Sequence, residues 1–438
     1  MGDQSIGIGL VGCGVVGSGV VKLLVEQAAL YRDRLGKSIE LRAVLCRRED
    51  IGERTAQVPT GKLVHDADAF FKQIADCDIV IELAGGKTFA LDIVRRSLAM
   101  GKHVVTANKA LLAAHGAELF ALARKHHVAI AYEASCAGGI PLITAMQFNL
   151  ASNQINALYG ILNGTCNYIL TQMTEQGKDY ATALREAQQQ GFAEADPTLD
   201  VTGGDTSHKL AILASMAFGV TVTDRDIPCS GIDTLKLDDI HFAQELGYRI
   251  KLLAIGERTD AGLSLSVAPC FVHANQPLAS VGGPFNAVSI FGHAVGHTLF
   301  YGRGAGQMPT ASAVVGDLLN IACGSYERVF NQLAIWPDQG KPLHKLSDDQ
   351  QMTRYYLRLN ALDVPGVVSR FSGALGEEGI SLAAVMQHEV NAGGFVPVVV
   401  VTHQTSVGAM RRAADRIASL DCINGRPVCI RIVDMPQG

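Results

Sequence analysis

The sequence has no excess of basic charge. Its 37 Lys and Arg residues are outnumbered by 42 Asp and Glu residues, which gives a net charge of -5 at pH 7. Proteins that bind nucleic acid or an anionic membrane surface usually present a strongly basic patch. A nearly even balance of basic and acidic residues does not suggest such a patch. The composition therefore disfavours both kinds of partner.

Long apolar runs and paired cysteines are also missing. Residues 134–174 contain no charged side chain, but Asn and Gln interrupt every window of about 20 residues there, so we expect no membrane span. None of the ten cysteines stands in a C-x-x-C pair, which argues against a zinc site and a disulfide framework. No basic residue precedes the apolar run 6–21, as a signal peptide would require. We expect a cytoplasmic protein with buried thiols.

The first 132 residues alternate short apolar runs with segments of helical pattern. The chain of 438 residues, 48% of them hydrophobic, is long enough for about two to four domains. Here we predict strands at residues 6–11, 41–45, 79–83, 103–106 and 128–132, and helices at 18–30, 90–100 and 109–126. This alternation predicts an α/β domain whose parallel sheet is covered by helices on both faces.

A glycine motif, Gly12-x-Gly14-x-x-Gly17, follows the first predicted strand and opens the first helix. In this context the first glycine allows a tight turn, the second lets the backbone approach a pyrophosphate, and the third lets the helix pack on the strand. Backbone amides at the start of the helix, from Val15 and Val16 onward, would hold the phosphates. The motif therefore predicts a bound nicotinamide dinucleotide.

The end of the second predicted strand bears on which dinucleotide is bound. An acidic residue there would bond the ribose hydroxyls of NAD. The sequence instead has Arg47 and Arg48, whose guanidinium groups suit the 2′-phosphate of NADP. NADP is therefore the predicted cofactor. NAD remains an alternative, because the acidic residues Glu49 and Asp50 follow directly.

Two lysines and a group of carboxylates are the candidates for chemistry. Lys109 follows the predicted strand 103–106, and ligands bind beyond the carboxyl ends of such strands. Residues 191–205 carry four carboxylates, those of Glu194, Asp196, Asp200 and Asp205, and Lys209 lies one helical turn further on. Carboxylates can hold an ammonium group, and a shielded lysine can transfer a proton near neutral pH. Helix caps and solvated ion pairs are the alternatives for each residue taken singly.

The pattern changes after Glu133, where Gly138-Gly139-Ile140-Pro141 interrupts the chain. Beyond it we predict helices at residues 168–190 and 206–218, strands at 248–256, 263–272, 287–292 and 298–301, and a helix at 309–322 that returns to the first domain. The final segment predicts strands at 355–360, 383–388, 395–402 and 427–433 with helices at 367–378 and 406–420. These six elements form a βαββαβ unit.

Taken together, these segments resemble the homoserine dehydrogenases of the long bacterial type. The matching segments are the glycine motif, Asn108-Lys109, and residues 132–141, 194–209 and 301–310, in the same order and with similar spacing. That family reduces L-aspartate 4-semialdehyde to L-homoserine with NADPH or NADH, on the path to threonine, isoleucine and methionine. The resemblance implies the same activity here, in a protein without an aspartate kinase domain.

The resemblance also implies roles for individual residues. Lys209 would protonate the carbonyl oxygen, and Lys109 would lie beside the nicotinamide and the substrate. The residues matching substrate positions are Glu194, Asp205, Asp200 and Gly191, of which Asp200 would also support the lysines, and Gly306 matches a position near the cofactor. A sodium ion would be bound by Glu133 and by the backbone carbonyls of Cys136, Gly138 and Ile140, oxygen ligands that suit a hard cation.

The carboxy-terminal unit resembles an ACT domain, a regulatory module that binds amino acids. The matching residues are 363–368 and 378–382. Asp363 and Gly366 stand at the first strand-to-helix turn, where a glycine lets a ligand come close. The resemblance implies feedback inhibition by L-threonine, and subunit assembly alone is the alternative.

The expected organisation is therefore α/β in three parts. A Rossmann dinucleotide-binding domain spans residues 1–139 and is completed by 307–335. An α+β catalytic and dimerisation domain spans 140–306, a linker spans 336–351, and a ferredoxin-like ACT domain spans 352–438. We expect a homodimer, or a homotetramer formed through the ACT domain. A dehydrogenase of another small amino or keto acid, and a nucleotide-dependent sensor without catalysis, are the alternative functions.

Overall fold

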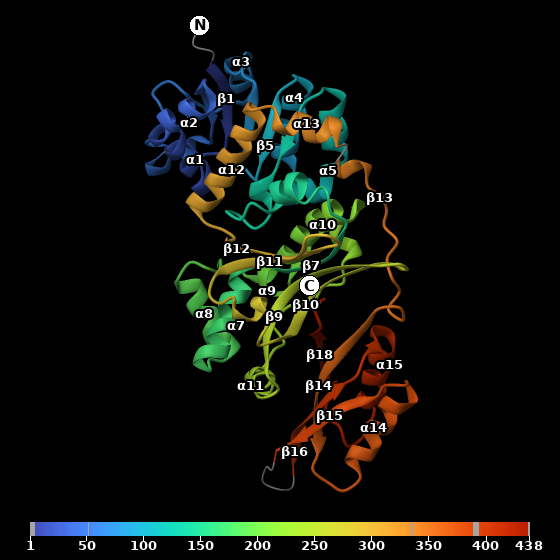
Figure 1. The fold of residues 1–438 in the computed structure, drawn as a ribbon. Helices are drawn as coiled ribbons and strands as arrows, with labels where there is room; N and C mark the ends of the chain where they lie inside the picture. The colour runs from blue at the N-terminus through green and yellow to red at the C-terminus, as the bar shows by residue number, and fades with distance from the viewer. Residues whose placement is uncertain (1–4, 51, 334–335, 389–393, 437–438) are drawn as a thin grey trace. The chain divides into compact units, whose positions relative to one another are not determined.

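The computed structural model describes residues 5–50, 52–333, 336–388 and 394–436. The ends of the predicted domains at residues 1–4, 334–335 and 437–438 lie outside the described residues. The chain forms two compact units (Figure 1). The first contains Met1–Asn156, Ser207–Ile227 and Phe285–Leu343, and the second contains Ala157–Thr206, Pro228–Pro284 and His344–Gly438.

A six-stranded parallel sheet forms the centre of the first unit. Its strands are β1 (Ser5–Val11), β2 (Ser38–Leu45), β3 (Leu63–Val64), β4 (Ile79–Glu82), β5 (His103–Thr106) and β6 (Ile130–Ala131). They are arranged in the order β3-β2-β1-β4-β5-β6, which is the order of the doubly wound dinucleotide-binding fold. The predicted α/β domain is therefore confirmed.

The helices that connect these strands are α1 (Val15–Glu26), α2 (Ala28–Leu35), α3 (Ala67–Gln73), α4 (Thr88–Ala99) and α5 (Lys109–Lys125). The single helix predicted at residues 18–30 is wrong, because the chain turns at Gln27 and forms two helices. Strand β4 is buried over its whole length, as expected where helices cover both faces of a parallel sheet.

Helix α12 (Gln307–Ala322) packs against α1. A Cβ atom on Gly19 would lie 3.0 Å from the Cβ of Ala311, so a larger residue would require the two helices to shift slightly apart. Gln307 Nε2 also donates a hydrogen bond of 2.9 Å to Ser18 Oγ. The remaining elements of this unit are α6 (Leu142–Thr144), β8 (Val220–Thr221), β11 (Phe285–Gly292), β12 (Gly296–Arg303), α13 (Ser325–Gln332) and β13 (Lys341–Pro342).

The second unit contains a mixed sheet in the order β7-β9-β10-β18-β14-β16-β15. Its first elements are β7 (Ile155–Ile161), α7 (Gly164–Gln176), α8 (Tyr180–Gln189), α9 (Thr198–Val201), α11 (Leu237–Glu245), β9 (Tyr248–Thr259) and β10 (Gly262–His273), and α10 (Gly204–Phe218) begins here. The helix predicted at residues 168–190 is wrong, because Gly177 adopts a positive φ of 63° and separates α7 from α8. Strand β7 and helix α11 were not predicted.

The predicted βαββαβ unit is confirmed in the carboxy-terminal part of the second unit. It consists of β14 (Met352–Leu362), α14 (Val367–Glu377), β15 (Leu382–Gln387), β16 (Phe395–Thr402), β17 (Thr405–Ser406), α15 (Val407–Ala418) and β18 (Val428–Val433). The order β18-β14-β16-β15 is that of a ferredoxin-like sheet, and all three of its pairings are antiparallel. Strand β18 also pairs in parallel with β10, so the unit extends the neighbouring sheet.

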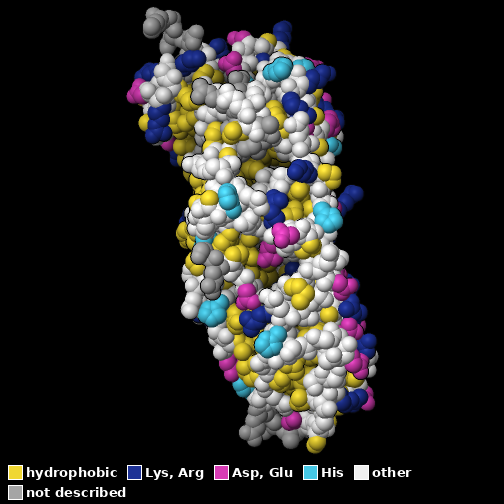
Figure 2. Space-filling view, turned by 45° about the vertical axis from the view of Figure 1, so that its right-hand side comes forward, with side chains coloured by type: hydrophobic (Ala, Val, Ile, Leu, Met, Phe, Trp, Pro, Cys, Tyr) yellow, Lys and Arg dark blue, Asp and Glu magenta, His cyan; other side chains and the backbone are white. Residues whose placement is uncertain are grey.

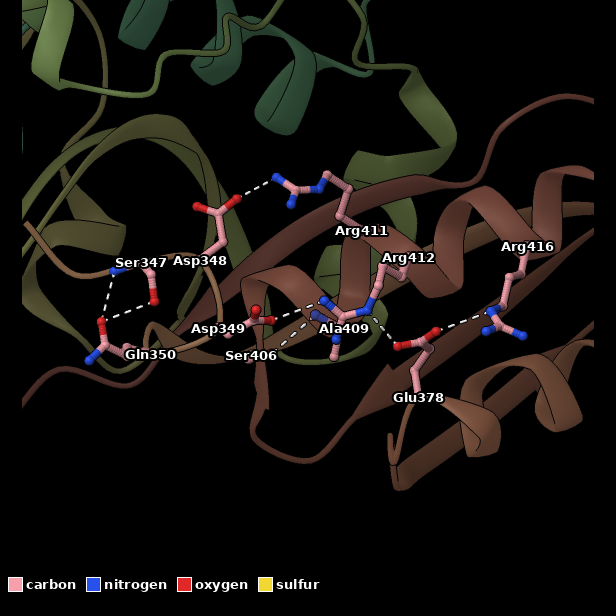
Figure 3. Close-up of polar contacts among 10 residues, drawn as sticks. All are labelled: Ser347, Asp348, Asp349, Gln350, Glu378, Ser406, Ala409, Arg411, Arg412 and Arg416. Carbon is pink, nitrogen blue, oxygen red and sulfur yellow. Dashed lines mark hydrogen bonds and ion pairs between the residues drawn. The ribbon is translucent and has the colours of Figure 1, made fainter.

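The end of the segment predicted as a linker is held by charged side chains of α15. Figure 3 shows Asp348 paired with Arg411, and Asp349 paired with Arg412 over 3.1 Å. Arg412 also donates to Glu378, and this guanidinium lowers the pKa of the Glu378 carboxyl. Exposed ion pairs contribute little individually, but together they fix residues 348–349 against the start of α15.

The surface bears both signs of charge. On the face drawn in Figure 2, Lys and Arg side chains are interspersed with Asp and Glu side chains. No helix in the described part of the chain is long and apolar enough to cross a membrane. All ten cysteines are thiols, but the expectation that they are all buried is wrong for Cys229, Cys323 and Cys429, which are exposed.

One lysine is buried in the second unit. Only 5% of Lys251 in β9 is exposed, and its Nζ donates hydrogen bonds to the Val281 carbonyl and to Oδ1 of Asn167. Burial lowers the pKa of Lys251 to about 8, because the ammonium form loses its hydration. The protonated lysine therefore reduces the stability of the fold near neutral pH.

We predict that Lys251→Met raises the free energy of unfolding at pH 7 by about 1 to 3 kcal/mol. In the wild type, stability from this group should rise between pH 8 and 10.5, since there the unfolded chain holds the proton and the folded chain does not. Urea unfolding across this range, with exposed Lys125→Met as control, measures both effects. An unchanged pH dependence in the Lys251 variant would contradict the prediction.

Candidate active site

The glycine motif forms a tight turn between β1 and α1. Gly12 has a φ of 92°, and a Cβ there would lie 2.6 Å from the Leu83 carbonyl. A Cβ on Gly17 would lie 2.1 Å from the Gly12 oxygen, whereas a Cβ on Gly14 would meet nothing within 4 Å. Gly12 and Gly17 are thus required by the fold itself, and Gly14 leaves open space where a ligand can approach.

A cavity of about 990 Å³ opens at this turn, at the carboxyl ends of β1, β2 and β4. Among its lining residues are Gly12, Gly14, Cys46, Arg47, Glu49, Glu53, Arg54, His65, Gly85 and Gly86. Arg47 pairs with Glu49 over 2.9 Å. The neighbouring predicted residue, Arg48, is exposed and is not among the lining residues. Sequence reasoning missed Arg54 and His65, which come from other segments of the chain.

The predicted residues at the start of α1 are placed to meet an anion. Gly14 is the residue before the helix and has no side chain to cap it, so the amides of the first turn lack a side-chain acceptor. Val15 is 48% exposed at this end. An anionic group in the cavity would satisfy these amides and would interact favourably with the helix dipole.

Glu82, at the end of β4, organises the far side of the cavity. It is fully buried, and its Oε1 accepts hydrogen bonds from the amides of Ala84 and Gly85, while its Oε2 accepts one from Thr106 Oγ1 at 2.8 Å. Burial raises the pKa of Glu82, and these hydrogen bonds oppose the rise. Glu82 was not predicted as a site residue, and its side-chain partner Thr106 lies 24 residues further along the chain.

Lys109 is the first residue of α5. Asn108 caps this helix with Oδ1, which accepts the amide of Leu111 at 3.1 Å, and its Nδ2 donates to the Gly86 carbonyl at 2.7 Å. The cap therefore joins the start of α5 to the glycine-rich loop of the cavity. Lys109 is half-buried at this junction.

The charges of the two predicted catalytic lysines act on one thiol in the first unit. Cys136 is fully buried, and its Sγ lies 3.9 Å from the backbone oxygen of Lys209. Burial raises the pKa of Cys136 to about 12, and the charges of Lys209 and Lys109 oppose that rise. The thiol thus experiences the positive charge of both lysines.

Glu133, the predicted sodium ligand, is buried in the same unit. Its two carboxylate oxygens accept the amides of Ile143 at 2.8 Å and Thr144 at 2.7 Å. Burial raises the pKa of the Glu133 carboxyl. The adjacent turn has two successive left-handed residues, Ala137 and Gly138, and a Cβ on Gly138 would lie 2.4 Å from the Gly304 oxygen.

In the second unit, two of the predicted carboxylates are held together by one amide. Asn163 Nδ2 donates to Asp200 Oδ1 at 2.8 Å and to Asp205 Oδ2 at 2.9 Å. Asp205 is buried and Asp200 is half-buried. Asn163 was not predicted as a site residue, because it is separated from both aspartates by about 40 residues of sequence.

The other predicted site residues lie on turns. Glu194 is exposed on the loop after α8, and Gly191 begins that loop with a φ of 74°. Gly306 precedes α12 and has a φ of 121°. In the βαββαβ unit, Gly366 precedes α14 with a φ of 91°, and Asp363 Oδ1 accepts a hydrogen bond from Gln387.

The fold and these groups define a class of protein. A doubly wound domain with a glycine-turn cavity at the carboxyl ends of its strands is the architecture of a dinucleotide-binding enzyme, here joined to a ferredoxin-like module. Three family models match the chain: "Homoserine dehydrogenase, NAD binding domain" at residues 12–133, "Homoserine dehydrogenase" at 141–319 and "ACT domain" at 355–418.

Comparisons with individual proteins extend this match to the whole chain. A homoserine dehydrogenase of Pseudomonas aeruginosa is 41% identical over 436 residues, which covers 98% of this chain and 99% of that protein. A crystal structure of a homoserine dehydrogenase from Thiobacillus denitrificans has a TM-score of 0.91 at 38% identity, covering 98% and 99%. One from S. aureus has a TM-score of 0.77 at 31% identity, covering 99% and 100%. The chain belongs to the homoserine dehydrogenase family, whose members are oxidoreductases that act on CH–OH groups and bind a nicotinamide cofactor.

Gly14 and Gly17 allow the roles of the turn in nucleotide binding and in folding to be tested separately. We predict that Gly14→Ala lowers the affinity for NAD(P)H at least about tenfold with an unchanged thermal midpoint, since the new methyl group enters open space that the pyrophosphate needs. Gly17→Ala should instead lower the thermal midpoint. Fluorescence titration of the nucleotide and thermal unfolding measure the two effects. Equal nucleotide affinity for Gly14→Ala and wild type would place the pyrophosphate elsewhere.

Proposed function

We propose that the protein catalyses the reversible, NAD(P)H-dependent reduction of L-aspartate 4-semialdehyde to L-homoserine. Family membership over 98% of the chain supports the reaction. The mechanism is supported by Lys109 and Lys209, whose positive charges both act on the Cys136 thiol, and by Cys136 Sγ, which lies 3.9 Å from the Lys209 backbone oxygen. Reduction of an aldehyde needs such charge where the oxygen becomes negative.

In this proposal the bound nicotinamide supplies the hydride, and the protein supplies the proton. Lys209, as an ammonium ion, donates a proton to the carbonyl oxygen and stabilises its developing charge. Lys109, fixed by the Asn108 cap, adds a second positive charge beside the reacting carbon. In the reverse direction Lys209 accepts the hydroxyl proton of homoserine.

The carboxylates bind the amino acid in the same proposal. Glu194 and Asp205 hold the α-ammonium and hydroxyl groups of the substrate, with Gly191 beside them, and Asp200 supports the lysines. Carboxylates suit an ammonium group because charge-assisted hydrogen bonds are stronger than neutral ones. Asp205 stands four residues before Lys209 in α10, a spacing that places both residues on one side of a helix.

The two roles have different kinetic signatures. We predict that Lys209→Ala lowers kcat by about 100-fold or more, the range for loss of a general acid, with a small change in KM. Glu194→Leu should mainly raise KM for homoserine, because it removes binding common to the ground and transition states. Steady-state kinetics test both, with exposed Lys125→Ala as control. Near-normal turnover of Lys209→Ala at saturation would exclude it as the proton donor.

We further propose that NADP is the preferred cofactor. Arg47 lines the cavity together with Arg54 and His65, so three basic side chains line the space in which a 2′-phosphate would bind. Arg48 would then assist from the exposed side. The acidic residues Glu49 and Glu53 also line the cavity, which leaves NAD usable. The ratio of kcat/KM for NADP⁺ and NAD⁺ tests this preference.

We propose a sodium site at Glu133. A buried carboxylate and the backbone carbonyls of Cys136, Gly138 and Ile140 are oxygen donors suited to a hard cation. The raised pKa of Glu133 has burial as its main cause, so a bound cation would stabilise the ionised carboxylate. Such an ion would fix the turn that carries Cys136 near the lysines. A higher thermal midpoint in sodium chloride than in choline chloride tests the site.

We propose that the ACT domain binds L-threonine near Asp363 and Gly366 and inhibits the enzyme. A direct connection to helix α11 supports this. Asp239 of α11 is fully buried and accepts two hydrogen bonds from Arg358 of β14, at 2.7 and 3.0 Å, and one from Tyr356 at 3.2 Å. A change in β14 would therefore move α11, which contacts α7 and β9.

This connection predicts the response to threonine. The double variant Asp239→Leu with Arg358→Met should stay folded, because an apolar pair can replace a buried ion pair. We predict that, without threonine, this variant turns over like the wild type. The threonine concentration that gives half inhibition should rise about fivefold or more. A truncated chain ending near Ser347 is a poorer test, because it removes β18 from β10. Exposed Arg370→Ala is the control. Inhibition of the double variant by threonine at wild-type concentrations would contradict the role of the Asp239–Arg358 pair.

We propose that the functional form is a homodimer, or a homotetramer through the ACT domain. Strand β12 alternates exposed and half-buried residues, with Tyr301 56% exposed, as a strand that packs on a second copy would. Sedimentation at several protein concentrations tests the assembly.

We also propose the following domain limits. The dinucleotide-binding domain comprises residues 1–139 and 307–335, the catalytic domain 140–306, the linker 336–351 and the ACT domain 352–438.

A further inference from the structure

Asn163 is buried beside two aspartates of the 191–205 segment. It is 5% exposed and directly precedes α7. Its Oδ1 accepts the amide of Cys166 at 2.8 Å, and its Nδ2 donates to Asp200 and Asp205. Both hydrogens of the amide nitrogen are therefore used, and each is directed at a different carboxylate.

The arrangement does more than cap a helix. A cap needs only the Oδ1 acceptor, which serine or aspartate supplies equally well. Two carboxylates held close together repel each other, and a donor shared between them offsets this repulsion. Because the two N–H bonds of a planar amide diverge at a fixed angle, the amide also sets the separation of the two carboxylates. Neither serine nor aspartate at position 163 can do this.

The backbone around Asp200 is already fixed by other contacts. Cys166 Sγ donates to the Asp200 carbonyl at 3.2 Å, and the amide of Ile232 donates to the Val201 carbonyl at 2.8 Å. Gly231 lies so close to that carbonyl that a Cβ would approach it to 1.9 Å. The backbone of Asp200 and Val201 is thus held by contacts that do not involve Asn163. Asn163 acts on the carboxylate side chains.

We infer that Asn163 is a positioning residue, whose amide orients Asp200 and Asp205 for binding and turnover of the substrate. The inference rests on the proposed function, in which these two aspartates act on the substrate and the lysines. It assigns to Asn163 a role in the reaction that acts through the aspartates, without contact with the substrate.

Asn163→Ser tests the role because it keeps the cap and removes the shared donor. We expect kcat/KM for homoserine to fall about ten- to a hundred-fold, the usual effect of losing hydrogen bonds to charged groups. Most of this loss should be in KM, with NADPH affinity unchanged and the thermal midpoint within about 2 °C of the wild type. Asp179→Ser is the matched control, because Asp179 caps α8 with the same geometry. Its kinetics should match the wild type.

Asn163→Ala removes both the cap and the donor. We expect its kinetics to resemble those of Asn163→Ser, with a lower thermal midpoint. Wild-type kinetics of Asn163→Ser, within twofold in kcat and KM, would overturn the inference and leave Asn163 as a helix cap only.

A double-mutant cycle with Asp205→Asn separates this inference from the proposed function. If Asp205→Asn raises KM and the double variant is no worse than the poorer single variant, Asn163 acts through Asp205 as inferred. If Asp205→Asn raises KM, but the double variant raises KM by the product of the two single effects, the inference is overturned. The proposed role of Asp205 then stands. If Asp205→Asn leaves KM unchanged, the proposed substrate role of Asp205 fails, and the inference fails with it whatever Asn163→Ser does.

Discussion

The close approach of α1 to the strand before it is the constraint on which the cofactor cavity depends. A Cβ on Gly17 would lie 2.1 Å from the Gly12 oxygen, and the Gly12 amide donates to the Leu45 carbonyl at 2.8 Å. These backbone contacts place the start of α1 and the ends of β1 and β2 around one cavity. Only residues without side chains allow such contact, so the chemistry of the first unit follows from this steric requirement.

Buried polar side chains then position the reactive groups in both units. Glu82 fixes the loop of the cavity, Asn108 fixes the start of α5 beside Lys109, and Asn163 fixes two aspartates. Each donates or accepts several hydrogen bonds, which compensates for its loss of hydration. The connection between Asp239 and Arg358 extends the same principle to the ACT domain, where a satisfied ion pair joins β14 to α11.

The parts of the molecule that could be predicted from sequence are those with a local pattern. The glycine motif, the alternation of strands and helices, and the βαββαβ unit depend on neighbours within a few residues. The helix predicted at residues 168–190 failed because Gly177 ends α7 within an otherwise helical pattern. Asn163 and Arg358 could not be predicted, because their partners are 37 to 119 residues away and no local spacing relates them. Lys109 and Lys209 were candidates from their positions after a predicted strand and on a predicted helix, and the family resemblance supplied their roles.

The most direct test of the account is the oxidation of L-homoserine by the purified protein, followed through the absorbance of the reduced nicotinamide. Parallel reactions with NADP⁺ and NAD⁺ use the same protein and substrate. We expect turnover with both cofactors, with a higher kcat/KM for NADP⁺. Folded protein that binds the nucleotide but does not oxidise homoserine with either cofactor would contradict it.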